Sequence, residues 1–221
     1  MSGQKRVLCY GDSNTWGYIP GTGGRFPQEI RWTGIAQREL GQGYQILEAG
    51  LNGRSTVFED PFEPFRCGVA GLGYALLEAA PIDLLVLSLG TNDLKFTGSA
   101  GAARGVATLI TRARQVWTEA KLSVRTPILV FAPILLHPDI WEIDPWPWSG
   151  FAQSYEKSLD FWRTYRQMAD EFHVHLLNAA EYADPSAVDG IHMEAESHLR
   201  LGRAAAEAIR QVLPEALAAA E

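Results

Sequence analysis

Three residues of this sequence have the types and positions needed for nucleophilic catalysis by a serine. A serine hydroxyl is a weak nucleophile until a nearby base takes its proton. Ser13 supplies the hydroxyl, His192 is the candidate base, and Asp189 lies three residues before it, close enough to orient the imidazole. Each also has a structural alternative: Ser13 as a helix N-cap, His192 as a surface residue, and Asp189 as a turn residue.

Five short apolar segments predict the strands of one sheet. Their runs of Val, Ile and Leu, clearest over residues 84–87, are typical of strands buried on both faces, which belong to parallel sheets. Apolar residues at helical spacing lie between them. We expect strands over residues 5–10, 44–49, 82–89, 127–132 and 174–178, and helices over residues 32–40, 74–80, 102–120, 151–172 and 194–213. This alternation predicts one doubly wound α/β domain over residues 1–221, with right-handed crossovers.

Polar segments follow three of these strands and precede the last helix. They are Gly11–Thr15, Gly50–Gly53, Gly90–Asp93 and Asp189–His192. In open α/β sheets the ligand site lies at the carboxyl ends of the strands, so we expect the four segments to meet at one edge. Two acids within them, Asp12 and Asp93, are interpreted as structural residues that accept hydrogen bonds from loop amides.

The composition argues against several classes of function. The net charge is −7, the pI is about 5.3, and no basic run of five or more residues occurs. Nucleic acids and anionic membrane surfaces are therefore not expected partners. The first apolar stretch, residues 7–10, is too short for a signal-peptide core or a membrane span. We therefore expect the cytoplasm as the location.

Neither a metal ion nor a cofactor is expected. The Gly21–Gly24 run lacks the lysine and hydroxyl residue that complete a Walker-type phosphate loop. Of the two cysteines, Cys9 is typical of a buried small hydrophobe and Cys67 lies in a proline-rich loop; a disulfide between them is left open. The spacing typical of metal ligands is not found among four of the histidines: His137, His173, His175 and His198.

The four polar segments, in this order on this frame, resemble the SGNH hydrolase family, also called GDSL-type esterases. The stretches Tyr10–Gly17, Arg31–Gly34 and Leu89–Asp93 are similar to its bacterial arylesterase branch, which includes acyltransferases and perhydrolases. The resemblance implies a three-layer α/β/α, flavodoxin-like fold around a five-stranded parallel sheet. One departure is Asn14, which stands where the family name expects leucine. Because it flanks the nucleophile, we expect this change to affect substrate fit more than chemistry.

The resemblance also implies which groups stabilise the oxyanion of a tetrahedral intermediate. They are the backbone N–H groups of Ser13 and Gly53 and the side chain of Asn92, with Gly50 and Asn52 left open as alternatives to Gly53. A turn role is the structural alternative for Gly53 and Asn92. Six residues beside the polar segments could line an acyl or alcohol pocket or simply pack, and Lys95 could be held by a nearby acid. They are Asn14, Trp16, Lys95, Ile134, Phe151 and Ile191.

Two loops are longer than the architecture needs. Residues 54–73 contain Phe58, Phe62 and Phe65, and residues 135–150 contain three tryptophans among three prolines. Long loops in a compact domain are usually functional or interfacial. Because the arylesterase branch is often oligomeric, we expect a homo-oligomer in which these loops supply the interface, with packing over the domain's own surface as the alternative. The tryptophans are Trp141, Trp146 and Trp148.

These observations together predict a serine esterase acting on small, acetyl-type carboxylic esters through an acyl-serine intermediate. Water, an alcohol or peroxide could take the acyl group. A carbohydrate acetyl esterase is the nearest alternative, ahead of a thioesterase or lysophospholipase. A catalytically idle binding module is the alternative of another class, which the intact set of polar segments argues against. The expected partner is a small-molecule ester.

Overall fold

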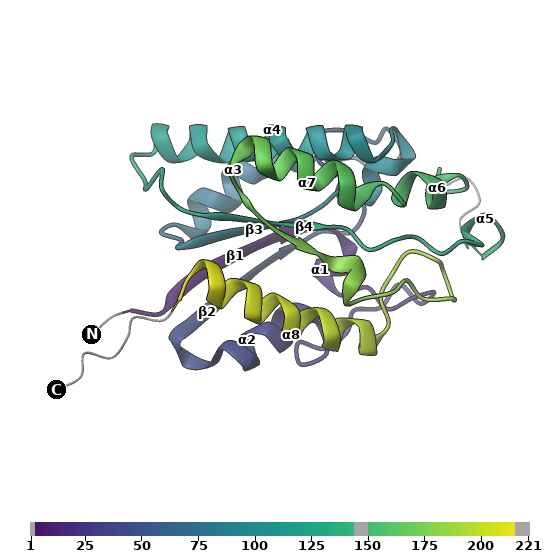
Figure 1. Ribbon diagram of the computed structural model, residues 1–221, viewed down its shortest axis with the longest axis horizontal. Helices are drawn as coiled ribbons and strands as arrows, with labels where there is room; N and C mark the ends of the chain where they lie inside the picture. Colours follow the sequence, from purple (N-terminus) through teal and green to yellow (C-terminus); the bar gives the residue numbers. More distant parts are fainter. Residues whose placement is uncertain (1–2, 144–149, 215–221) are drawn as a thin grey trace.

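A five-stranded parallel sheet forms the centre of the molecule (Figure 1). The computed structural model describes residues 3–143 and 150–214. Its strand order is β2-β1-β3-β4-β5, with every neighbouring pair parallel. The strands are β1 (Lys5–Gly11), β2 (Tyr44–Gly50), β3 (Leu84–Ser88), β4 (Ile128–Ala132) and β5 (His175–Asn178). The predicted five-stranded parallel sheet is thereby confirmed.

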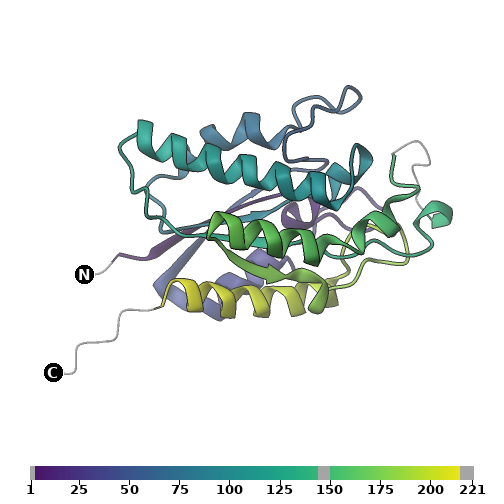
Figure 2. The same ribbon diagram turned by 45° about the horizontal axis from the view of Figure 1, so that its top comes forward.

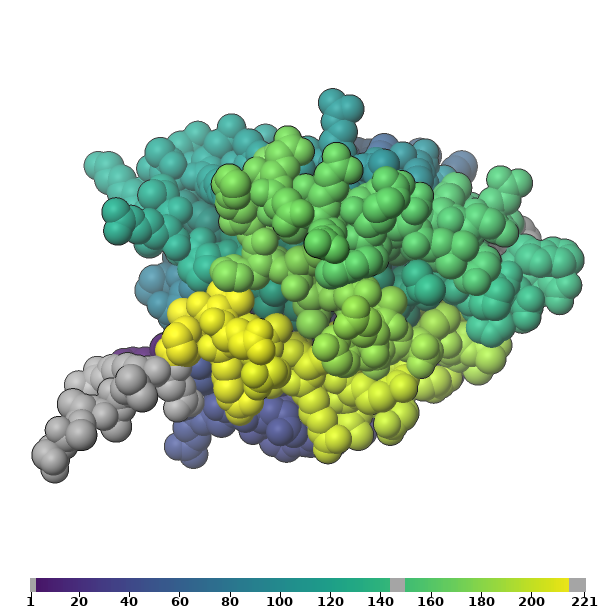
Figure 3. Space-filling model, in the orientation of Figure 1, coloured from purple at the N-terminus to yellow at the C-terminus, as the bar shows by residue number. Residues whose placement is uncertain are grey.

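Helices cover both faces of this sheet and complete three layers (Figures 1 and 2). One layer holds α3 (Gly68–Ala79), α4 (Ser99–Glu119) and α7 (Phe161–Phe172), and the other holds α2 (Trp32–Leu40) and α8 (Ala195–Val212). In the space-filling view, the later part of the chain from α7 to α8 covers most of the visible face (Figure 3). Short helices lie near the carboxyl edge of the sheet: α1 (Ser13–Trp16), α5 (Ile140–Ile143), α6 (Ser154–Ser158) and the 3₁₀ turn Asn92–Lys95. Two further 3₁₀ turns span Gly41–Gly43 and Ala179–Glu181.

The central strands send alternate side chains into two separate apolar cores. Leu8 and Leu85 pack on the side of α3, α4 and α7, whereas Val7 and Val86 pack on the side of α2 and α8. Water is therefore excluded from both faces of the sheet, and an apolar residue is favoured at every position of the central strands. This explains the continuous Val, Ile and Leu runs that predict these strands. In the described residues, no helix is long and apolar enough to cross a bilayer.

Two predicted helices differ from the structure. The helix expected at 74–80 begins at Gly68, because two glycines at its start accommodate close neighbours: Gly68 contacts the Ser55 carbonyl and Gly71 lies against the Tyr10 hydroxyl. The helix expected over 151–172 is divided into α6 and α7. At the break Ser158 Oγ donates to the Tyr155 carbonyl, a local bond that competes with the helical pattern.

The apolar stripe expected along residues 151–172 is correspondingly shorter. Tyr165, Met168 and Ala169 are buried, but Leu159 and Trp162 lie partly in solvent. Only the α7 portion therefore packs as an amphipathic helix against α4.

Candidate active site

The turn that carries Ser13 follows directly from the end of β1. Asp12 caps α1 by accepting a hydrogen bond from the Asn14 amide at 3.0 Å. A Cβ at Gly11 would collide with Thr15 and the Ser88 carbonyl, so only glycine fits where the chain turns from strand to helix. Ser13 thus lies at the carboxyl end of a central strand, with 6% of its surface exposed.

His192 and Asp189 lie in the segment before α8 and reach Ser13 across the edge of the sheet. His192 Nε2 is 2.9 Å from Ser13 Oγ, and His192 Nδ1 is 2.8 Å from Asp189 Oδ2. Asp189 Oδ1 accepts the amides of Ile191 and His192 at 3.1 and 3.0 Å. The structure therefore brings the three sequence-predicted residues into one continuous hydrogen-bonded chain.

The surroundings of Asp189 keep it ionised. Burial by itself would raise the pKa of this carboxyl, but the hydrogen bond and charge of His192, with two backbone amides, lower the pKa below its usual value. Gly21 N–H donates to Oδ2 as well, at 3.2 Å. An ionised Asp189 favours the histidine tautomer with its proton on Nδ1, which leaves Nε2 free to accept the Ser13 proton.

Tyr18 is a neighbour of the histidine that the sequence analysis did not identify. Its ring stacks on His192 with 4.1 Å between ring centroids and 26° between planes. It also lines the cavity in front of Ser13. Tyr18 follows the Tyr10–Gly17 stretch by one residue, and nothing in its local spacing signals a contact with a residue so distant in sequence.

Asn14 occupies a different place from the one expected. Its Oδ1 accepts the Met193 amide at 3.1 Å, and its Nδ2 donates to the Ile191 carbonyl at 3.4 Å. The side chain therefore contacts the backbone on either side of His192 and is not among the residues that line the cavity. The sequence interpretation of Asn14 as a residue of substrate fit is not supported by this position.

Three groups with the chemistry of an oxyanion hole face the same cavity as Ser13. Gly53 adopts φ +73°, a left-handed conformation that favours glycine. In the described ranges, the amides of Ser13 and Gly53 donate to no other residue. Asn92 Nδ2 donates to the Arg54 carbonyl at 3.2 Å, which uses one of its two protons. Gly50 instead packs beneath the Trp16 backbone and does not line the cavity.

Two charged residues, half-buried Arg54 and buried Asp93, hold the loops that carry these donors. The Arg54 guanidinium donates to the Gly11 carbonyl at 2.8 Å and to the Ala49 carbonyl, and lies 4.0 Å from the Tyr10 ring centroid. Asp93 accepts the Thr56 amide at 3.0 Å and the Thr56 hydroxyl. Burial raises the pKa of Asp93 to about 7. This acid thus joins the Gly53 loop to the Asn92 turn, in keeping with its interpretation as a structural residue.

The cavity in front of Ser13 has a volume of about 760 Å³, within the range of small-ligand sites. Three of the six expected pocket residues line it, namely Lys95, Phe151 and Ile191. Trp16 and Ile134 do not: Trp16 lies beside Arg25, and Ile134 belongs to the core under α8. Its lining is formed by Ser13, Tyr18, Asn52, Gly53, Asp60, Phe62, Glu63, Arg66, Asn92, Lys95, Phe151, Ile191 and His192.

One wall of this cavity is charged. Lys95 Nζ donates to Glu63 Oε2 at 2.9 Å and contacts Asp60 Oδ2 at 3.5 Å, so it is held by acids as the sequence analysis allowed. Arg66 lies in the same wall and forms no ion pair within the described part of the chain. Asp60, Glu63 and Arg66 were not predicted as site residues from the sequence.

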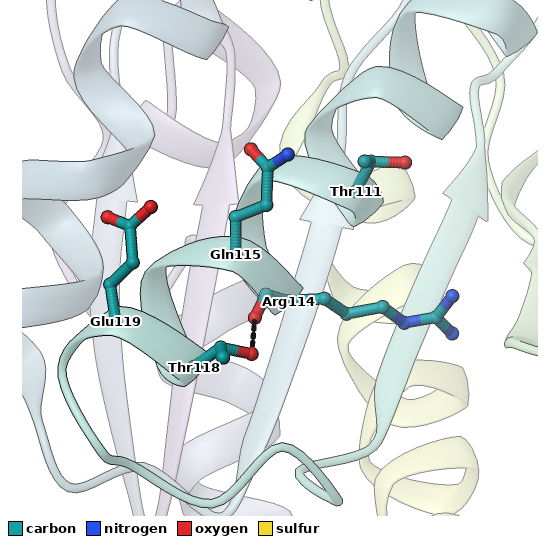
Figure 4. A pocket seen from close by; sticks show the side chains of 5 residues that line it. All are labelled: Thr111, Arg114, Gln115, Thr118 and Glu119. Carbon is teal, nitrogen blue, oxygen red and sulfur yellow. Dashed lines mark hydrogen bonds between the residues drawn. The ribbon is translucent and has the colours of Figure 1, made fainter.

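A second hollow, on the outer surface of α4, has no comparable chemistry (Figure 4). Its hydroxyls bond their own helix, since Thr118 donates to the Arg114 carbonyl at 2.8 Å. Arg114 reaches the Phe172 carbonyl at the end of α7. Its lining residues are Thr111, Arg114, Gln115, Thr118 and Glu119.

The remaining histidines and the cysteines do not form a metal site. Across residues 3–143 and 150–214 no three His, Cys, Asp or Glu side chains are placed to hold a metal ion. His198 is buried and accepts the Trp32 amide on Nδ1 at 3.3 Å, and burial lowers its pKa to about 3. Cys9 and Cys67 are both buried and unbonded.

The chain is similar to known esterases over almost its whole length. A family model described as the GDSL-like lipase/acylhydrolase family matches residues 9–200. A carbohydrate acetylesterase from Sinorhizobium meliloti is 34% identical, with a TM-score of 0.88, over 95% of this chain and 100% of that one. The native aryl esterase of M. smegmatis is 32% identical, with the same TM-score and coverage.

A putative arylesterase from Agrobacterium tumefaciens str. C58 is 32% identical, with a TM-score of 0.85, over 95% of this chain and 100% of that chain. No curated protein sequence matches the chain. The family match and these whole-chain similarities show that the chain belongs to the GDSL-like lipase/acylhydrolase family, the SGNH hydrolases, and is a carboxylic ester hydrolase.

Proposed function

We propose that this protein hydrolyses small, acetyl-type carboxylic esters through an acyl-serine intermediate. The observation that carries the proposal is the hydrogen-bonded chain from Asp189 through His192 to Ser13, which ends in the wall of a ligand-sized cavity. A serine, a base and an orienting acid in this relation are the arrangement that nucleophilic acyl transfer requires.

In the first half of the reaction Ser13 Oγ attacks the ester carbonyl while His192 Nε2 takes the hydroxyl proton. The negative charge that develops on the carbonyl oxygen is stabilised by the amides of Ser13 and Gly53 and by Asn92 Nδ2. Protonated His192 is stabilised by ionised Asp189 and then gives its proton to the leaving alcohol. In the second half, water repeats these steps on the acyl-serine and restores the free enzyme.

The test is release of p-nitrophenol from p-nitrophenyl acetate, butyrate and octanoate by the wild type and by Ser13→Ala. We expect the highest kcat/KM on acetate and a loss of several orders of magnitude in the variant. Equal rates for the two proteins would overturn the serine mechanism. Inactivity of the wild type on every ester would revive the alternative of an idle binding module.

A carbohydrate acetyl ester is the second candidate substrate, and the charged wall of the cavity favours it. Glu63, Lys95 and Arg66 offer hydrogen-bond acceptors and donors that an aryl group cannot use but sugar hydroxyls can. One similar protein is named a carbohydrate acetylesterase. Comparing kcat/KM for an acetylated methyl glucoside with that for cyclohexyl acetate separates the two, because both have a six-membered ring but only the glucoside carries free hydroxyl groups and other sugar oxygens.

Transfer of the acyl group to acceptors other than water is a further part of the proposal. The acyl-serine reacts with an alcohol or peroxide whenever such an acceptor competes with water in the cavity. The apolar side chains of Phe62, Phe151 and Ile191 line this cavity and favour an acceptor less polar than water. The measurement is ester formation against hydrolysis in water containing an alcohol. A yield no higher than in an uncatalysed control would remove this activity from the proposal.

We also propose that the protein is a cytoplasmic homo-oligomer. Phe62, Phe65 and Trp141 are exposed large hydrophobic residues in the two long loops, whereas Trp146 and Trp148 lie outside the described residues. The unbonded state of both cysteines is consistent with a reducing compartment. A monomeric mass by light scattering at micromolar concentration would contradict the oligomer, and cell fractionation tests the location.

A further inference from the structure

The nucleophile and the base are carried by two segments from opposite ends of the chain. Ser13 follows β1, while His192 lies outside the sheet, between the turn Ala179–Glu181 and α8. The hydrogen bond between Ser13 and His192 cannot by itself hold these segments in place, because its proton moves in each half of the reaction. Their separation must therefore be maintained by groups that do not take part in the chemistry.

Asn14 supplies two such links from the residue next to the nucleophile. Its side-chain oxygen accepts the Met193 amide at 3.1 Å, and its side-chain nitrogen donates to the Ile191 carbonyl at 3.4 Å. These two backbone groups flank His192 in sequence. One carboxamide therefore contacts the peptide on each side of the base.

The backbone of Asn14 is fixed as firmly as its side chain. Its amide donates to Asp12 Oδ1 at 3.0 Å, so Ser13 lies between two residues that are bonded to each other. Asn14 is 8% exposed, and a buried hydrogen bond keeps its geometry better than one that water can replace. The nucleophile turn and the base segment are thus joined through one side chain.

The side chain at this position must be both donor and acceptor. A leucine would satisfy neither the Met193 amide nor the Ile191 carbonyl, and an aspartate would satisfy only the amide. A buried backbone group without a hydrogen-bond partner lowers the stability of the fold. The segment that carries His192 would therefore shift until the Met193 amide and the Ile191 carbonyl found other partners. A displacement of about 1 Å between reacting groups is enough to slow catalysis about a hundredfold.

We propose that Asn14 is a positioning residue that holds His192 Nε2 at hydrogen-bonding distance from Ser13 Oγ through both proton transfers. The proposal rests on the serine mechanism proposed above. Asn14 does not touch the substrate, so its effect falls on turnover and leaves binding of the ester largely unchanged.

The experiment compares Asn14→Leu, Asn14→Asp and a control, Asn178→Leu, on p-nitrophenyl acetate. Asn178 donates to Glu181 at 3.1 Å in an exposed hydrogen bond and does not line the cavity, so its substitution makes the same Asn-to-Leu change and removes a side-chain hydrogen bond away from the site. We expect Asn14→Leu to lower kcat about ten- to a hundredfold while KM changes less than threefold. The control should keep wild-type kcat and KM.

Asn14→Asp provides a second measurement that does not depend on how well the leucine variant folds. A carboxylate at this position lies beside His192 and favours its charged form, so the acidic limb of the kcat/KM profile should move to higher pH by about half a unit or more. In the control, Asn178→Leu, the acidic limb of the kcat/KM profile should stay at its wild-type pH. This shift reports where the side chain lies, which a general loss of stability would not.

The outcomes separate this inference from the proposed function. A wild type that depends on Ser13, with Asn14→Leu within twofold of its kcat, would overturn only the positioning role. An unmoved acidic limb in Asn14→Asp, or equal losses in Asn14→Leu and Asn178→Leu, would do the same. A wild type without esterase activity, or one whose activity survives Ser13→Ala, would instead remove the mechanism on which the inference rests.

Discussion

The two walls of the cavity are built in opposite ways. The wall with Ser13 and His192 is buried, and hydrogen bonds join it across nearly 180 residues of sequence, as in the pair Asn14–Met193. A second wall comes from the loop of residues 58–66, in which Phe62 and Phe65 are 92% and 89% exposed. The difference indicates that the first wall fixes the chemistry, while the second wall is the part that can vary with the substrate.

The bonds within each wall support this division. Asp60 Oδ1 accepts the amides of Phe62 and Glu63, so the loop is held mainly by its own residues and by Lys95. Asp189, in contrast, accepts hydrogen bonds from the Ile191 amide, from the amide and imidazole of His192 and, 168 residues away in sequence, from the Gly21 amide. We therefore expect substitutions in the catalytic wall to affect turnover strongly and those in the loop to affect it weakly.

The largest effect should come from Asp189→Asn. The amide cannot stabilise imidazolium and permits the wrong histidine tautomer, so kcat should fall by about four orders of magnitude with little change in fold. The control is Asp184→Asn, an exposed acid of the same segment paired with Arg200. The assay is p-nitrophenyl acetate hydrolysis with circular dichroism of each variant; a loss below about tenfold would show that Asp189 does not orient the base.

A smaller effect is expected from Asn92→Ala, which removes one of the three proposed oxyanion donors. Losses of about a hundred- to a thousandfold in kcat are usual for such a donor, with KM nearly constant. Because Asn92 also bonds the Arg54 carbonyl, the melting temperature must be measured beside kcat. A proportional rise in KM instead of a fall in kcat would assign Asn92 to ground-state binding.

The sheet and the proposed catalytic residues can be predicted from the sequence for physical reasons that are local. A strand buried on both faces is apolar throughout, as Leu84–Leu87 shows, and glycine is required at Gly11 where strand and helix meet. The residue types at Ser13, Asp189 and His192 follow from the chemistry proposed for each. Such requirements are visible in sequence because they do not depend on distant neighbours.

Features that depend on tertiary contacts were not predictable in this way. The start of α3 is hidden by Gly68 and Gly71, which are poor helix formers kept for close packing. Tyr18 acquires its role only by stacking on His192, and Asn14 only by reaching the backbone around it. The polarity of each residue is evident in the sequence, but its partner is set by the fold.

The charged wall offers an electrostatic test of intermediate size. The Glu63 carboxylate lies against Gly53, a proposed oxyanion donor, and forms an ion pair with Lys95. Lys95→Met should therefore lower kcat about tenfold, because an unpaired anion beside the hole opposes the oxyanion. Adding Glu63→Gln should restore most of the loss. A double variant as slow as Lys95→Met would show that the lysine acts by another route, and raised salt should reduce the effect.

The smallest effect is expected from a substitution of Phe65. Phe65 lies in the exposed loop and Gly53 in the catalytic wall, and both have a left-handed backbone conformation, so the two positions can be compared directly. Phe65 and Gly53 have φ values of 68° and 73°, a left-handed region that costs a bulky residue about 1 kcal/mol and glycine nothing. Phe65→Asn should raise the melting temperature by about 1–2 °C, since asparagine tolerates this conformation. Phe62→Asn is the control, with a similar loss of exposed apolar surface but no positive φ. Gly53→Ala should lower the melting temperature. If Phe65→Asn lowered it as well, the backbone of the exposed loop would be as tightly constrained as that of the catalytic wall.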